Sequence, residues 1–277
     1  MNAATHFRTI DISTMQPTVL APQPAPQMLW VELEQLVIDD RYQRPINDGN
    51  RRAIKRIASG FRWSRFSPVI VAPIEGGRYA LIDGQHRAHA AALCGIKSIP
   101  AMVALVAPEE QAQAFIDINT RQIRVGSEQV YRAALTANEP WAIACRDAVE
   151  AAGCRLMTSK YSTAAKKPGQ VFCVDLIRRM VEAGKADAVT IGLKSMLEYD
   201  PSATANFSNA MLVPWLGAVA ETGANAVQLV ASLNARRPWL VIETADRLAK
   251  AEGKPLAVTR RGFFVAAIHQ VQRESEA

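Results

Sequence analysis

The sequence predicts an α+β protein in which a small α/β domain is followed by an all-helical half. Short apolar segments alternate with helical segments as far as residue 126, whereas the apolar spacing beyond about Ser127 is helical only. The length of 277 residues suits one large domain or two modest ones. We therefore expect a flexible Pro- and Gln-rich arm at 1–27, an α/β domain at 28–126 and a helical domain at 127–277.

The expected α/β domain contains clear start and stop signals. Asn47 or Asp48 is suited to cap a helix, Gly76-Gly77 to form a hairpin turn, and Gly95 to end a helix. Proline followed by acids at 108–110 is typical of a first helical turn. The expected elements are helix 49–59, strands 68–72 and 78–82, helix 85–94, strand 101–106 and a helix from residue 108.

The helical half shows apolar residues at helical spacing, with glycine or proline near several junctions. We expect no strand there. The apolar helices beyond Phe207 are a candidate dimer face, and the oligomeric state stays open. The expected helices lie near 128–137, 140–152, 170–183, 186–199, 207–221, 224–234, 238–251 and 260–274.

Composition narrows the class of protein. Hydrophobic residues make up 49% of the chain and charged residues 21%, as in folded globular proteins. No apolar run reaches the roughly 18 residues of a membrane span, and the start lacks a basic-then-apolar pattern. We therefore expect a cytoplasmic protein without a membrane partner. The four cysteines and four histidines form no zinc pattern.

Positive charge is concentrated in one segment. Between Arg41 and Arg65 lie eight basic residues and a single acid, Asp48, while the whole chain carries a net charge of only +6. Such a segment indicates a phosphate-bearing partner, either nucleic acid or nucleotide, although a solvated helix face is an alternative. The candidate DNA contacts on helix 49–59 are Arg51, Arg52, Lys55 and Arg56.

The most informative motif is Asp83-Gly84-Gln85-His86-Arg87, where a strand ends and a helix begins. The first N–H groups of a helix lack internal partners, and the helix dipole adds positive potential, so this turn is a candidate phosphate site. Gly84 allows close approach of a phosphate, and Arg87 offers a bidentate contact. Asp83 is a candidate general base or an orienting group for Arg87. The alternative is an ordinary turn whose His86 and Arg87 pair with acids.

Two further groups of residues are ambiguous. His86 and His89 lie three residues apart on one helix, but no third ligand for a metal is evident. Lys160, Lys166 and Lys167 surround Tyr161 in a loop that suits either nucleic-acid contact or a solvated connector. The five tryptophans are expected to be core or interface anchors.

The Asp-Gly-Gln-His-Arg box after a strand, with Gly-Ile-Lys-Ser-Ile-Pro downstream, resembles the ParB/sulfiredoxin-like superfamily, in particular its DGQHR-type branch. In partition proteins the corresponding turn holds nucleotide phosphates, which implies this role for Gly84, Gln85, His86 and Arg87. Tyr42-Gln43-Arg44-Pro45 is similar to a second box of the family and adds Arg44. The segment 117–122 is similar to a third box, in which Asn119 matches a residue that helps to hold a magnesium–nucleotide complex.

The resemblance implies a nucleoside triphosphate with Mg²⁺ as cofactor, DNA as partner and an origin in plasmids, phages or other mobile elements. Ile118 replaces an acid of the partition proteins, which argues against metal-assisted hydrolysis. Gln85 replaces the cysteine of sulfiredoxins, which argues against reductase chemistry, and no helix-turn-helix is evident after Ser127.

Three classes of function therefore stay open. The first is a nucleotide-binding, DNA-associated protein. The second is a nuclease, nucleotide triphosphatase or phosphotransferase with Asp83 or His86 as base and with Arg44 and Arg87 stabilising charge. The third is a non-catalytic module that binds a protein partner.

Overall fold

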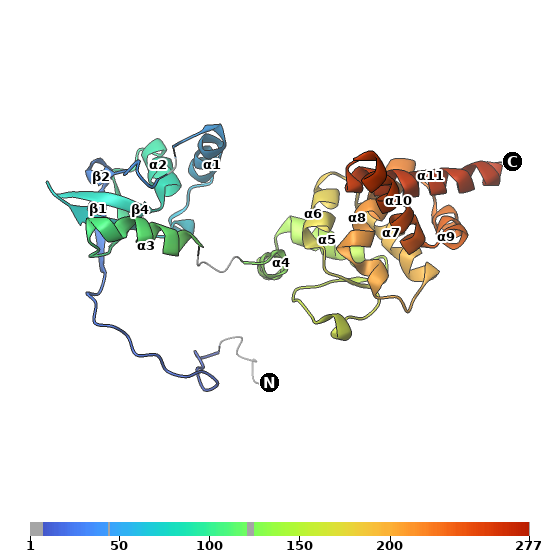
Figure 1. Cartoon of the computed structure of the whole chain (residues 1–277), viewed down its shortest axis with the longest axis horizontal. Coiled ribbons are helices and arrows are strands. Elements are labelled where there is room, and N and C mark those ends of the chain that lie inside the picture. The colour runs from blue at the N-terminus through green and yellow to red at the C-terminus, as the bar shows by residue number, and fades with distance from the viewer. Residues whose placement is uncertain (1–7, 44, 121–124, 277) are drawn as a thin grey trace. The chain divides into compact units, whose positions relative to one another are not determined.

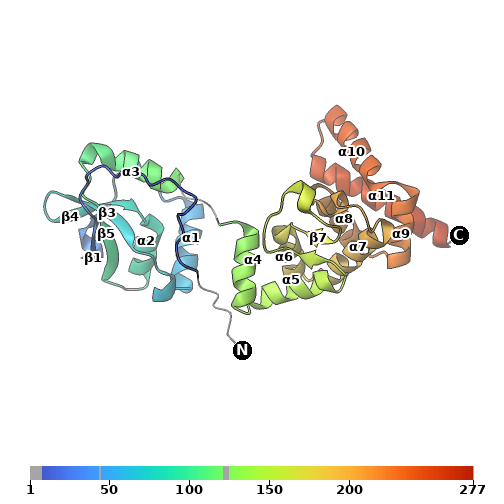
Figure 2. The same cartoon turned by 90° about the horizontal axis from the view of Figure 1, so that it is seen from below.

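The computed structural model describes residues 8–43, 45–120 and 125–276. The chain divides into two compact units, Met1–Ile123 and Arg124–Ala277 (Figures 1 and 2). The predicted combination of a mixed-sheet domain with a helical half is confirmed.

The first unit is built on a five-stranded mixed sheet with the strand order β1-β5-β3-β4-β2. Two pairs, β1 with β5 and β3 with β4, are antiparallel, and two pairs, β3 with β5 and β2 with β4, are parallel. The strands are β1 (Gln27–Glu32), β2 (Leu36–Val37), β3 (Val69–Ile74), β4 (Arg78–Asp83) and β5 (Ser98–Val103).

Helices cover both faces of this sheet, with α1 and α2 on one side and α3 on the other (Figure 1). The apolar core between the sheet and α2 contains Val69, Val71 and Leu81 from the strands and Ala88 and Ala91 from the helix. The helices are α1 (Asp48–Ser59), α2 (Gln85–Leu93) and α3 (Pro108–Thr120), with 3₁₀ turns at Leu33–Gln35 and Trp63–Arg65.

The predicted hairpin and helices of this unit are confirmed, but three strands differ from expectation, since β1 and the two-residue β2 were not predicted and β5 begins earlier than expected. Strand β1 was not predicted, because only Val31 among its residues is buried and no alternating pattern results. Strand β5 begins at Ser98 instead of near residue 101, and it therefore contains Pro100. The pairing of β5 with β3 starts only at Ala101, so Pro100 lies where the strand has β1 as its sole neighbour.

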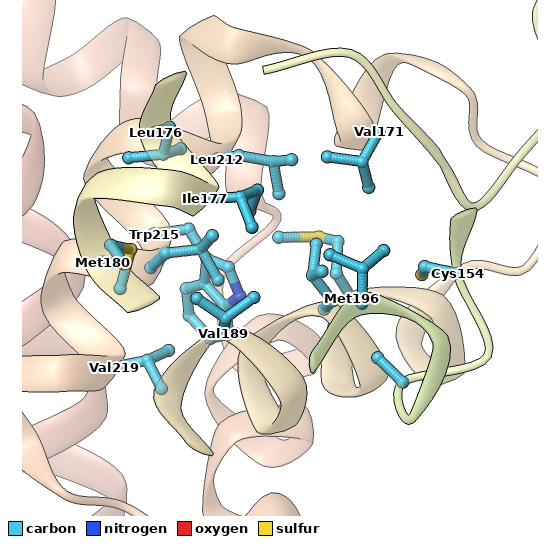
Figure 3. Packing of buried hydrophobic residues seen from close by; sticks show 14 of the residues in the cluster. Cys154, Val171, Leu176, Ile177, Met180, Val189, Met196, Leu212, Trp215 and Val219 are labelled. Carbon is cyan, nitrogen blue, oxygen red and sulfur yellow. The ribbon is translucent and has the colours of Figure 1, made fainter. Parts of the chain in front are cut away.

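The second unit is mostly helical, and its helices enclose a continuous apolar core. Figure 3 shows side chains from α6, α7 and α8, among them Ile177, Met196 and Trp215, meeting in this core. The helices are α4 (Ser127–Thr136), α5 (Pro140–Glu150), α6 (Val174–Glu182), α7 (Ala186–Tyr199), α8 (Asn209–Thr222), α9 (Ala226–Ala235), α10 (Pro238–Glu252) and α11 (Leu256–Glu276), with 3₁₀ turns at Thr163–Ala165 and Ala205–Phe207.

The expectation that the helical half contains no strand is wrong. Residues Arg155–Leu156 (β6) and Gln170–Val171 (β7) form a short parallel pair. The predicted helix 170–183 therefore begins only at Val174, because Gln170 and Val171 belong to the strand. Two-residue strands are too short to produce a recognisable period in a sequence.

The tryptophans occupy different environments. Trp215 is fully buried in the second unit, where its indole N–H donates to the carbonyl oxygen of Gly192 at 2.8 Å. In the first unit, Trp30 and Trp63 are 64% and 50% exposed, and their rings lie 5.5 Å apart. The described helices include none that is long and apolar enough to span a membrane.

Candidate phosphate-binding turn

The turn between β4 and α2 is the centre of the candidate site. Gly84 occupies the N-cap position of α2 with φ +103°, a backbone conformation that L side chains rarely adopt. A Cβ at this position would lie 2.6 Å from Cγ1 of Val69 and 2.9 Å from Nη2 of Arg87. Glycine is therefore required both by the backbone conformation and by close packing, and it leaves α2 without a capping side chain.

The guanidinium of Arg87 is held in place by two neighbours. Its Nη2 donates to Oδ2 of Asp83 at 2.9 Å, and its Nη1 donates to the carbonyl oxygen of Ser67 at 3.0 Å and also to the Ser67 hydroxyl. The side chains of Arg87 and Asp83 are only 20% and 28% exposed. This contact fits the orienting role that the sequence offered for Asp83 as one of two possibilities, and the role itself stays a prediction.

A cavity of about 370 Å³ opens in front of this turn. It collects residues from the Asp83–Arg87 motif, from α1, from α3 and from the loop before α1. Asn50 and Ile57 of α1, together with Phe115 of α3, form its other walls. The full lining is Gln43, Asn50, Ile57, Ile82, Asp83, Gly84, Gln85, His86, Arg87, Phe115 and Asn119.

Gln43 is a site residue that the sequence did not single out as a ligand contact. Its side chain is buried, and its amide Nε2 donates to the carbonyl oxygens of Leu81 at 2.8 Å and Ile82 at 3.1 Å. These carbonyls lie just beyond the β2–β4 pairing, which ends at Ala80. The amide therefore ties the loop before α1 to the end of β4 and fixes one wall of the cavity.

Phe115 was also missed, although a single turn of α3 separates it from the predicted Asn119. Its ring lies 5.6 Å from that of Tyr42, whose hydroxyl is buried and has no partner among the described residues. Burial raises the pKa of the Tyr42 phenol above its usual value. The segment that resembles the second family box thus helps to position the aromatic wall of the cavity.

The two histidines of α2 face different surroundings. His86 lines the cavity, whereas His89 lines a separate small pocket of about 190 Å³ and its Nδ1 lies 2.7 Å from the Gln85 carbonyl oxygen. They therefore do not point toward one common ion. In the described part of the chain, no three His, Cys, Asp or Glu residues are grouped so as to hold a metal.

The predicted basic helix borders the same cavity. Asn47 caps α1 by accepting a hydrogen bond from the Asn50 backbone N–H at 3.0 Å, and Ile54 is the buried anchor of the helix. The four predicted DNA contacts are all exposed on α1, and among the described residues only Arg51 of these four forms an ion pair, with Asp48 at 3.9 Å. These residues are Arg51, Arg52, Lys55 and Arg56.

Of the remaining predicted positions, one lies at the cavity and the others lie outside the described residues. Asn119 lies at the cavity, and its Nδ2 donates to the Phe115 carbonyl oxygen at 2.8 Å. Arg44, the other predicted phosphate contact, lies outside the described residues. So do Arg121 and Gln122 of the third box.

The fold and the turn define the first unit as a mixed-sheet domain with a glycine-capped helix start at a polar cavity. Residues 4–120 match the model of the ParB N-terminal domain family. This match confirms the predicted resemblance of the first unit to the ParB/sulfiredoxin-like superfamily. Membership of the DGQHR-type branch stays a prediction.

Solved structures of ParB proteins are similar to this chain at low identity. The C-terminally truncated chromosome-partitioning protein ParB from Caulobacter crescentus, complexed with CTP-γ-S, has 14% identity and a TM-score of 0.36, and the match covers 89% of this chain and 99% of that one. The same protein complexed to the centromeric parS site has 12% identity and a TM-score of 0.30 over 84% of this chain and 96% of that one.

A Pnob8-like ParB N-terminal domain has 14% identity and a TM-score of 0.28, with 90% of this chain and 97% of that chain covered. All three TM-scores are below 0.5. No curated protein matches the sequence.

Proposed function

We propose that the first unit binds the phosphates of a nucleoside triphosphate at the Asp83–Arg87 turn and that the protein is associated with DNA through α1. The observation that carries this proposal is the cavity in front of the uncapped start of α2, inside the segment that matches the ParB N-terminal domain family. The backbone N–H groups of His86 and Arg87 lie in the first helical turn, where anions are stabilised.

The charged groups of the cavity support an anionic ligand. Arg87 enters the lining with its guanidinium already fixed by Asp83 and Ser67, so little side-chain freedom is lost on binding. Gln43, Asn50 and Asn119 add amide groups, and Ile57 and Phe115 add apolar surface. This combination suits a ligand with both phosphates and a flat base.

Magnesium fits this site only together with a nucleotide. The single carboxylate in the lining, Asp83, is hydrogen-bonded to Arg87, so the protein offers mainly neutral amide oxygens, among them that of Asn119. Mg²⁺ commonly binds through one or two protein oxygens plus substrate phosphates, whose charge it partly neutralises. We therefore expect no binding of Mg²⁺ alone.

We assign DNA association to the exposed basic residues of α1. The first of them, Arg51, directly follows Asn50, which lines the cavity. Lysine and arginine on one helix supply phosphate contacts whose strength falls with salt concentration. The further expectation of an origin in plasmids, phages or other mobile elements stays part of the proposal and follows from the resemblance alone.

The nucleotide experiment is a binding and hydrolysis panel of CTP, ATP, GTP and UTP, each with and without Mg²⁺ and duplex DNA. We expect one nucleotide to bind and Arg87→Ala to weaken it by at least about tenfold, as for the removal of a charged hydrogen bond. His86→Ala and His89→Ala form a matched pair on one helix, and only the first should weaken binding. Absence of binding to every nucleotide contradicts the proposal.

The DNA experiment measures affinity for duplex DNA against salt concentration. Replacing Arg51, Arg52, Lys55 and Arg56 by alanine should weaken binding and reduce the salt slope by about one for each DNA phosphate that the helix no longer neutralises. Arg247→Ala, a change at an exposed arginine of α10, is the control. An unchanged slope in the fourfold variant contradicts the assignment of DNA contact to α1.

A further inference from the structure

The second unit contains a cavity of about 580 Å³ that is larger than the one at the Asp83–Arg87 turn. Its lining includes the starts of α6 and α8, the 3₁₀ turn before α8 and Lys166 from the loop between β6 and β7. Cavities of a few hundred cubic ångströms are typical of small-molecule sites. Nothing in the proposed function uses this one.

Two cations in the lining are not neutralised. Among the described residues neither Lys166 nor Arg179 forms an ion pair, although Asp175 also lines the cavity one helical turn before Arg179. The ammonium of Lys166 lies over the Phe172 ring, 4.9 Å from its centroid. The lining therefore carries two positive charges against the one negative charge of Asp175.

Two helix starts add to this positive potential. The N-cap residues of α6 and α8, Cys173 and Ser208, both line the cavity, and neither side chain caps its helix. The hydroxyl oxygen of Ser208 is buried and has no hydrogen-bond partner among the described residues. A buried polar atom without a partner costs free energy, and a bound ligand is one way to satisfy it.

Aromatic rings form the apolar part of the lining. Phe207 is almost fully buried, and the indole N–H of Trp239 donates to Oδ1 of Asn206 at 3.1 Å. Phe172 also lines the cavity, and the Tyr161 ring lies 6.1 Å from its ring. The cavity thus combines apolar surface with an excess of positive charge.

We infer that this cavity binds a phosphate ester with a flat apolar body. Arg179 and Lys166 contact the phosphate, the start of α8 with the Ser208 hydroxyl donates hydrogen bonds to it, and the aromatic rings hold the body. This chemistry is shared by free small phosphate esters and by the phosphorylated end of a nucleic-acid strand. The inference is independent of the proposed nucleotide site in the first unit.

The test uses the full chain and phenyl phosphate, which combines a ring with a phosphate and lacks a nucleotide's sugar. Ligand-observed NMR titration should show that phenyl phosphate binds more tightly than either inorganic phosphate or phenol. Arg179→Ala and Lys166→Ala should each weaken binding by about tenfold, whereas Arg247→Ala, outside the lining, should not. Ser208→Ala should weaken binding without lowering the melting temperature of the free protein.

Two further comparisons identify the class of ligand and the unit in which the probe binds. A 5′-phosphorylated dinucleotide that binds more tightly than phenyl phosphate assigns the site to a strand end, and the reverse order assigns it to a free ester. Unchanged binding in both Arg179→Ala and Lys166→Ala overturns the inference. Loss of binding in Arg87→Ala alone also overturns it, because the probe is then seated in the first unit, where the proposed function still stands.

Discussion

The starts of α2 and α6 share one local feature, a helix N-terminus without a capping side chain, but they differ in what surrounds it. Each helix begins at a cavity without a capping side chain, and each carries an arginine at that cavity. Arg87 is fixed by Asp83 and Ser67, whereas Arg179 has no ion-pair partner among the described residues.

The two arginines differ in how firmly the guanidinium is held in place and in how much of its positive charge is neutralised. A guanidinium held by a carboxylate is already positioned, so a ligand loses little binding free energy to ordering it, but its charge is partly neutralised. An unpaired guanidinium offers its full charge and must be ordered by the ligand. The first unit therefore has the more preorganised site, and the second unit the more strongly positive one.

The largest expected effect tests whether the two units are independent. Trp215→Ala removes a fully buried indole from the second unit and should lower its free energy of unfolding by about 3–5 kcal/mol. Urea unfolding, followed with limited proteolysis, should show the second unit unfolding early while the first keeps its transition. A common shift of both transitions would show that the two units unfold together.

The next effect concerns the glycine of the phosphate-binding turn. Gly84→Ala should lower the free energy of unfolding of the first unit by about 2–4 kcal/mol, since it adds backbone strain and a clash with Val69. Gly77→Ala is the matched control, because Gly77 also has positive φ but a Cβ there would meet nothing within 4 Å. Equal losses in the two variants would show that packing against Val69 is unimportant.

A smaller effect on the free energy of unfolding is expected from two N-cap residues, one whose side chain caps its helix and one whose side chain does not. Asn47→Ala removes the side-chain cap of α1 and should cost about 1 kcal/mol in chemical denaturation. Ser208→Ala in the free protein should cost nothing, because that hydroxyl makes no hydrogen bond with the described residues. A comparable loss in Ser208→Ala would mean that the hydroxyl has a partner in solution.

The smallest effect is a pH dependence of the free energy of unfolding of the second unit. Two hydrogen bonds of 2.6 Å from Arg260 hold the pKa of Asp246 below its ordinary value of 3.8. The pair between α10 and α11 therefore stabilises the fold fully above the unfolded pKa, and this contribution is lost as the pH falls through the lower folded pKa. Because both side chains are partly exposed, we expect at most about 1 kcal/mol.

Urea unfolding of wild type and Asp246→Asn at pH 7 and near pH 2 measures this contribution. The two proteins should differ at pH 7 and converge at the low pH. A difference that persists at the low pH would show that the ion pair is not its source.

Much of the first unit was predictable because its signals are local. The Asn47 cap, the Gly76-Gly77 turn and the Asp83–Arg87 turn each lie within a few residues, and neighbouring side chains and backbone conformation decide such features. The exposed basic face of α1 follows in the same way from the spacing of its charges around Ile54.

The rest depended on contacts between distant segments. Gln43 reaches carbonyl oxygens 38 and 39 residues away, and Phe115 enters the cavity from α3. The short β6–β7 pair and the edge strand β1 exist through pairing with remote partners. No period or motif in the sequence records such pairings. The sequence by itself located the candidate phosphate turn. Only tertiary packing decided which residues line its cavity and that Asp83 holds Arg87.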